Sequence, residues 1–82
     1  SAERIAETTR DIGRRLRAAR TGAGLTLAQV AGRAGVSEGF LSKLERGQAA
    51  ASIANLIQLA DALRLGLHEL FPNEAAPAKT MV

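Results

Sequence analysis

Apolar residues recur every three or four positions along most of this chain, which is the spacing of amphipathic helices. The first predicted helix runs from Thr9 to about Gly22, with Ile12 and Leu16 on its apolar face and Thr8 or Thr9 as its N-cap. Residues 1–8 are polar, and we interpret them as a frayed or helical extension. No segment alternates with the period of a strand, so the pattern predicts an all-α fold.

Two short helices and a tight turn are predicted next. Thr26 is the expected N-cap of the second helix, and Ser37 is the expected N-cap of the third, which runs from Glu38 to Arg46. Gly35 lies between them, where a sharp corner needs the left-handed conformation that glycine adopts without steric cost. The predicted buried residues of this pair are Leu27, Val30, Ala31, Ala34, Leu41 and Leu44.

The apolar pattern in the last part of the chain predicts two further helices. Ser52 caps the fourth, and Pro72 stops a short fifth. The expected apolar face of the fourth helix is formed by Ile53, Leu56, Ile57, Ala60 and Leu63. The fifth is expected from Leu65, Leu67, Leu70 and Phe71. Residues 9–72 are therefore predicted to form one domain of five helices around a single core, and the Ala/Pro-rich residues 73–82 a disordered tail or the start of a linker.

Composition excludes several classes of function. The chain has no cysteine, and His68 is its single histidine, so neither a disulfide nor a zinc site is expected. No apolar stretch is long enough to span a membrane, and no secretory signal is visible, which is consistent with a cytoplasmic protein. No activated nucleophile, carboxylate pair or phosphate-binding glycine loop is present. We therefore predict that the protein is not an enzyme and needs no cofactor.

The positive charge is concentrated in one segment. The net charge is only +3, but five arginines lie within residues 10–20, where Asp11 is the single acidic residue. A basic stripe attracts polyanions such as nucleic acids. A solvated basic helix face is an equally good explanation. Charge alone therefore leaves both open.

Residues 25–47 carry the most specific pattern in the chain. Two helices that cross steeply need a small residue at the crossing, glycine at the corner and an apolar wedge beyond it. Ala31, Gly35 and Val36 supply these three at the offsets of a helix-turn-helix. An ordinary helical hairpin is the alternative, and the density of matching features favours the helix-turn-helix.

On these residues the chain resembles the Cro/cI-type, or XRE, helix-turn-helix family from about Ile12 to Phe71. The resemblance rests on an Ile-Gly-x-Arg-Leu-Arg opening at 12–17, the corner just described, Leu-Glu-Arg-Gly at 44–47, and the apolar pattern from Ser52 to Phe71. Phe-Leu-Ser at 40–42 and the Leu-x-Glu-Leu-Phe ending are similar to regulators that carry a sensor domain, often a cupin, after the DNA-binding part. Two residues depart from the family: Leu27 replaces a glutamine that often meets a phosphate, and Ala51 replaces a frequent proline.

The resemblance implies that the third helix lies in the major groove of DNA. Its expected base-reading residues are Glu38, Gly39, Ser42 and Lys43. Glu38 also fits a simple role as a first-turn acid at the helix dipole, and Phe40 fits either a base contact or packing on the second helix. The expected phosphate-positioning residues are Thr26, Gln29, Ser37 and Arg46, together with Arg14 or Arg17. Arg20 and Glu45 are expected to form a structural ion pair beneath the motif.

The resulting prediction is a sequence-specific transcriptional regulator that binds double-stranded DNA as a homodimer on a palindromic operator. Leu59, Leu65, Leu67 and Phe71 are candidates for the dimer surface, and they fit core positions equally well. The alternative is a protein-interaction module of the same fold, either an antitoxin subunit or a bridging coactivator. That role predicts an apolar outer patch and tolerance of changes at residues 38–43.

Overall fold

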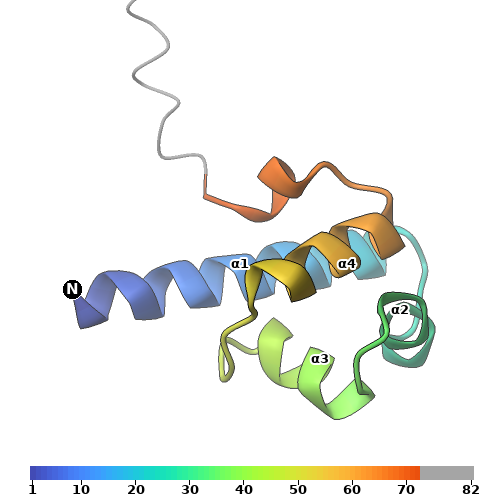
Figure 1. The fold of residues 1–82 in the computed structure, drawn as a ribbon, viewed down its shortest axis with the longest axis horizontal. Coiled ribbons are helices and arrows are strands. Elements are labelled where there is room, and N and C mark those ends of the chain that lie inside the picture. The colour runs from blue at the N-terminus through green and yellow to red at the C-terminus, as the bar shows by residue number, and fades with distance from the viewer. Residues whose placement is uncertain (73–82) are drawn as a thin grey trace, which may run out of the picture.

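The computed structural model describes residues 1–72, and the predicted tail at 73–82 lies outside the described residues. Four α-helices are present, α1 (Ala2–Gly22), α2 (Leu27–Ala34), α3 (Glu38–Glu45) and α4 (Ile53–Leu63), followed by the 3-10 turn η1 (Leu67–Leu70) (Figure 1). The all-α prediction is confirmed, whereas the expected fifth helix is only this turn. Gly66 precedes it, and Phe71 before Pro72 is extended at φ −104° and ψ 150°, as proline favours in the preceding residue.

Helix α1 is longer than the apolar pattern indicated. Its N-cap is Ser1, whose hydroxyl accepts a hydrogen bond from the amide of Arg4, so the prediction of a cap at Thr8 or Thr9 was wrong. Thr9 instead donates its hydroxyl hydrogen to the carbonyl of Ile5, 2.8 Å away, inside the helix. The extension at residues 1–8 is thus helical, and Figure 1 shows its first turns reaching past the rest of the fold.

The other three α-helices begin at the predicted caps. Thr26, Ser37 and Ser52 each accept a hydrogen bond from the backbone amide three residues later, which satisfies an amide that the helix leaves without a partner. Gly35 ends α2 in the left-handed conformation, at φ 74°. Helix α3 ends at Glu45, one residue earlier than predicted, and Arg46 is its C-cap.

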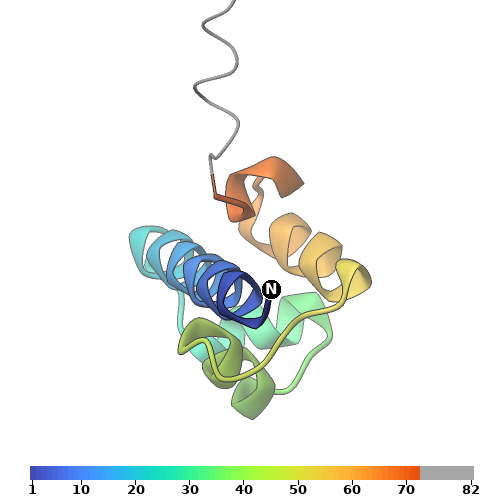
Figure 2. The ribbon, with the colours of Figure 1, turned by 90° about the vertical axis from the view of Figure 1, so that its left-hand side faces the viewer.

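The core is aliphatic and draws on every element. Its buried members are Leu16, Val30, Ala31, Ala34, Leu41, Leu44, Leu56, Leu59, Ala60 and Leu70. Helix α1 packs against α3 and η1, α2 packs against α3 and α4, and α4 packs against η1. Figure 2 looks along α1 and shows α3 on one side of it and η1 on the other.

Helix α4 buries only part of its predicted apolar face, with Leu56 and Ala60 in the core as expected. Ile53 and Ile57, expected to be buried, are 61% and 46% exposed, whereas Leu59 is completely buried. Helix α4 carries apolar residues around much of its circumference, so periodicity does not identify its inner face. Packing against α2 and η1 selects the side of Leu56, Leu59 and Ala60. The other three candidates for a dimer surface, Leu65, Leu67 and Phe71, are partly buried against the core.

Helices α1 and α3 meet at a glycine. A Cβ atom on Gly13 would overlap the carbonyl oxygen of Leu44 and would lie 2.8 Å from that of Glu45. Gly13 is buried, and its missing side chain lets the α1 backbone lie against the last turn of α3. This close approach helps to set where α3 lies on the body of the domain.

Candidate nucleic-acid interface

The turn between α2 and α3 has the geometry that the sequence pattern predicts. Gly35 is left-handed, and the amide of Val36 donates a hydrogen bond to the carbonyl of Ala31, 3.1 Å away. Ala31 is buried at the helix crossing, and Val36 is half-buried against the core. The corner therefore holds α3 across α2, with one side of α3 against the body and the other facing outward (Figure 1).

The outward face of α3 carries all four predicted base-reading residues. Glu38, Gly39 and Lys43 are exposed and Ser42 is half-buried, whereas Leu41, Leu44 and Glu45 form the buried face. Within residues 1–72, the side chains of Glu38, Ser42 and Lys43 form no hydrogen bond or ion pair. Phe40 is half-buried and packs against the core cluster, which favours the packing interpretation of this residue. The outer face of α3 is therefore free to contact a ligand.

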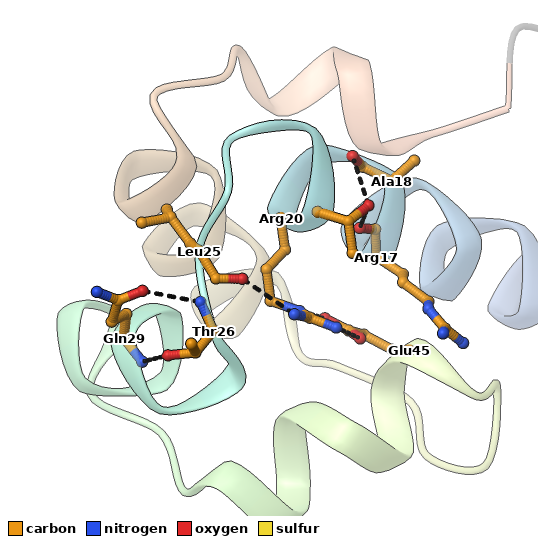
Figure 3. Close-up of polar contacts among 8 residues, drawn as sticks. Arg17, Ala18, Arg20, Leu25, Thr26, Gln29 and Glu45 are labelled. Carbon is orange, nitrogen blue, oxygen red and sulfur yellow. Dashed lines mark hydrogen bonds and ion pairs between the residues drawn. The ribbon is translucent and has the colours of Figure 1, made fainter.

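The cap of α2 uses the oxygen acceptors of two side chains. Gln29 donates its backbone amide to the hydroxyl oxygen of Thr26 (3.1 Å), and Thr26 donates its backbone amide to the Oε1 atom of Gln29 (2.8 Å) (Figure 3). Ser37 likewise accepts from the amide of Phe40, 3.0 Å away. These bonds leave the two hydroxyl hydrogens and the Gln29 Nε2 amide as donors, and phosphate oxygens accept hydrogen bonds.

The predicted phosphate-contacting arginines differ in their surroundings. Arg14 is exposed and pairs with Asp11 on the same helix, with 2.8 Å between Nη2 and Oδ1. Arg17 is exposed, and no interaction joins its side chain to the pair formed by Arg20 and Glu45 (Figure 3). Arg46 caps α3, and its Nε atom donates to the side-chain oxygen of Gln48 at 3.3 Å. Gln48 is not predictable from the sequence, because no local motif marks that contact.

Arg20 and Glu45 join α1 to the end of α3. Nε of Arg20 lies 2.7 Å from Oε2 of Glu45, and the Nη1 atom of Arg20 also donates to the carbonyl of Leu25 at 3.0 Å (Figure 3). The hydrogen bond to Glu45 raises the pKa of Arg20, with a further contribution from the charge of Glu45 and an opposing one from burial. Arg20 thus remains charged while it connects α1, the loop before α2 and the end of α3.

Two other features, a metal site and a membrane-spanning helix, are absent from the described part of the chain. Within residues 1–72, no three side chains of histidine, cysteine, aspartate or glutamate are grouped so that they could hold a metal ion. Among the helices of these residues, none is long and apolar enough to cross a membrane.

Known proteins resemble this chain over most of its length. A family model described as a helix-turn-helix domain matches residues 11–70. The restriction-modification controller protein C.AhdI from Aeromonas hydrophila is 36% identical, with a TM-score of 0.75 over 77% of this chain and 96% of that one. The clp gene regulator ClgR from C. glutamicum is 31% identical, with a TM-score of 0.73 over 90% and 92% of the two chains.

A third similar structure contains DNA. The biofilm master regulator SinR, solved in complex with DNA, is 35% identical, with a TM-score of 0.68 over 72% of this chain and 95% of that one. No curated protein sequence matches the chain.

Proposed function

The chain belongs to the helix-turn-helix domain family, and from this premise we propose that it is a sequence-specific transcriptional regulator that inserts α3 into the major groove of double-stranded DNA. The observation that carries the proposal is the outer face of α3. Its polar side chains have no partners within residues 1–72, while the opposite face is buried in the core. One structural relative is described as a gene regulator, and another, a master regulator for biofilm formation, was solved in complex with DNA.

The side chains on α3 supply complementary chemistry for base edges. Lys43 donates to N7 and O6 of guanine, Glu38 accepts from N4 of cytosine, and Ser42 can do either. Gly39 brings only backbone to this face. In this proposal these four positions read sequence, because three of them are exposed and Ser42 lies half-buried beside them, away from the buried residues of α3.

The donors around α3 fix its register on the DNA backbone. Phosphates are the proposed partners of the cap hydroxyls of Thr26 and Ser37 and of the side-chain amide of Gln29. The acceptor oxygens of these groups are occupied by cap hydrogen bonds, so only their donors are available, and phosphate oxygens accept from donors. Arg46 contacts a phosphate beyond the end of α3. Of the two α1 arginines, we favour Arg17, since Arg14 is partly neutralised by Asp11.

A second copy of the chain is part of the proposal. One small module makes few contacts, so useful specificity requires two copies on a palindrome, with half-sites about 34 Å apart. We place the contact between copies on α4, where Ile53 and Ile57 lie one turn apart and expose apolar surface. These two isoleucines replace the four residues that the sequence suggested.

Two further features of the proposal rest on the family resemblance. A ligand-sensing domain, often a cupin in the regulators with the same α3 and terminal motifs, is expected to accompany this domain. A transcriptional regulator also acts where the DNA is, so the proposal includes a cytoplasmic location. The role is one of binding and requires no cofactor.

Selection from random duplex DNA at near-physiological salt tests the proposed function. The purified protein should enrich an inverted repeat, whose centre-to-centre spacing reports the symmetry of the dimer. Failure to enrich any sequence, with binding that disappears as salt rises, would contradict sequence-specific recognition. That second result would instead favour a protein-interaction module, for which changes at residues 38–43 have little effect.

A further inference from the structure

The glycine at position 39 has no explanation within the fold. Gly13 is required by the closeness of α3, and Gly35 and Gly47 have positive φ angles. Gly39 has neither feature: it is helical, its φ lies outside the left-handed range, and a Cβ added there would meet no atom within 4 Å. Glycine is among the least favourable helix residues, so the folded domain gains nothing from it at this position.

Gly39 lies on the proposed reading face, one helical turn before a cation. Lys43 follows it by one helical turn, so the two residues share a side of α3. Side chains on a helix lean towards its N-terminus, so the stem of Lys43 extends over the turn that contains Gly39. No protein atom occupies the Cβ position of Gly39, and Lys43 has no polar partner within residues 1–72. The space beside Gly39 is therefore unfilled, and the Lys43 ammonium group next to it is available to donate hydrogen bonds.

We propose that Gly39 is a specificity-determining residue: the space left by its missing side chain holds the edge of a G·C base pair, whose guanine accepts hydrogen bonds from Lys43. The inference rests on the proposed DNA-binding function and deepens it. A methyl group at position 39 would occupy the space that the base edge needs, and α3 would have to withdraw from the groove floor. Lys43 would then lose its reach to N7 and O6 of that guanine.

Gly32 offers a matched control on α2. It is exposed and helical, and it also has no atom within 4 Å of an added Cβ, but it lies outside the proposed reading face. Alanine at either position should keep or raise the midpoint of urea-induced unfolding, because alanine favours the helix. The two variants therefore differ only in what position 39 does towards DNA.

The test uses the duplex that the wild-type protein selects, and it measures affinity by fluorescence anisotropy. Gly39→Ala should weaken binding to this duplex by about tenfold or more, which is the range of one lost base contact, and change binding to unrelated DNA at low salt by less than about twofold. Gly32→Ala should leave both affinities unchanged. Replacing one guanine of the half-site by 7-deazaguanine should weaken wild-type binding and have no additional effect on Lys43→Ala.

Two results would overturn the inference. One is a Gly39→Ala variant that binds the selected duplex as tightly as wild type. The other is a set of 7-deazaguanine substitutions that affect wild type and Lys43→Ala equally. In both cases the selected sequence itself would still support DNA recognition by α3. If the wild-type protein selects no sequence, the proposed function and this inference fail together.

Discussion

The guanidinium of Arg20 and the carboxylate of Glu45 are joined by two hydrogen bonds, 2.7 Å from Nε to Oε2 and 3.0 Å from Nη2 to Oε1. The two residues are far apart in sequence, one in α1 and the other in the last turn of α3. Their side chains are 14% and 5% exposed. The forked, two-point contact restrains both the position and the rotation of α3, which carries the proposed reading face.

Replacing Arg20 by alanine should strongly destabilise the domain. The carboxylate of Glu45 would remain buried without its partner, and losses of this kind cost about 3 kcal/mol in the free energy of unfolding. Urea-induced unfolding followed by circular dichroism measures the change. Arg20→Lys should recover only part of it, because an ammonium group cannot form the two-point contact.

The exposed pair of Arg14 and Asp11 provides the control for this prediction. Its members are three residues apart on the surface of α1, so Arg14→Ala should cost less than about 0.5 kcal/mol. Comparable losses for Arg14→Ala and Arg20→Ala would show that burial does not make the Arg20–Glu45 contact special.

The raised pKa of Arg20 predicts the pH range in which the stability contributed by the Arg20–Glu45 pair changes. A folded-state pKa above the unfolded value gives stability that is complete below the unfolded pKa and is lost as the pH rises through the folded one. Arginine titrates far above neutrality, so the protonation of Arg20 should cause no change in the urea midpoint between about pH 6 and 9.

Alanine at position 13 should separate α1 from α3. The added Cβ would overlap the backbone of Leu44, and a backbone oxygen cannot move as the end of a flexible side chain can. We expect a loss of about 2 kcal/mol or more, in the range of overpacked cores. Gly22→Ala, at the open end of α1, should be neutral or stabilising, and equal effects at the two positions would contradict the close approach.

Arg64 is the one non-glycine residue with a positive φ, at 58°, among those described. It caps the end of α4 in the left-handed conformation, which costs an L-residue roughly 1 kcal/mol. Arg64→Gly should therefore raise the free energy of unfolding by on the order of 1 kcal/mol or less, and the melting temperature with it. The gain is limited because glycine also gives the unfolded chain more freedom. Arg64→Ala should show no such gain.

Phosphate and base contacts should respond differently to mutation. Arg46→Ala should weaken binding to all duplexes and reduce the slope of log K against log salt by about one. Lys43→Ala and Ser42→Ala should instead reduce discrimination between the selected operator and its single-base variants, by about 1–3 kcal/mol per lost contact. An unchanged sequence preference in both of the latter variants would rule out the proposed reading face.

The dimer surface on α4 is tested by Ile57→Asp. A carboxylate at this exposed position should leave folding intact and prevent apolar contact between two copies. Analytical ultracentrifugation on the palindromic duplex should then show one bound copy at concentrations where wild type binds as two. Gln58→Asp, at the neighbouring exposed position of α4, is the charge-matched control. Two bound copies with Ile57→Asp would place the dimer contact elsewhere.

The helix caps, the turn between α2 and α3, and the outward side of α3 follow from the sequence alone, because these depend on residues close together in the chain. Caps at Thr26, Ser37 and Ser52 and the left-handed turn at Gly35 depend on residues within three or four positions of one another, so spacing predicts them. The outward position of Glu38, Gly39 and Lys43 also follows from the period of α3 once its buried side is known. The Arg20–Glu45 pair was expected only through the family resemblance, since nothing local links two such distant residues.

Tertiary packing decided the remainder. Whether α4 buries Ile57 or Leu59 depends on what α2 and η1 place against it, because the helix is apolar on more than one side. The need for glycine at position 13 arises only where the α3 backbone meets α1. Such contacts join residues far apart along the chain, and their energies depend on shape and distance in three dimensions. A periodic pattern of apolar residues gives neither the shapes nor the distances on which these energies depend.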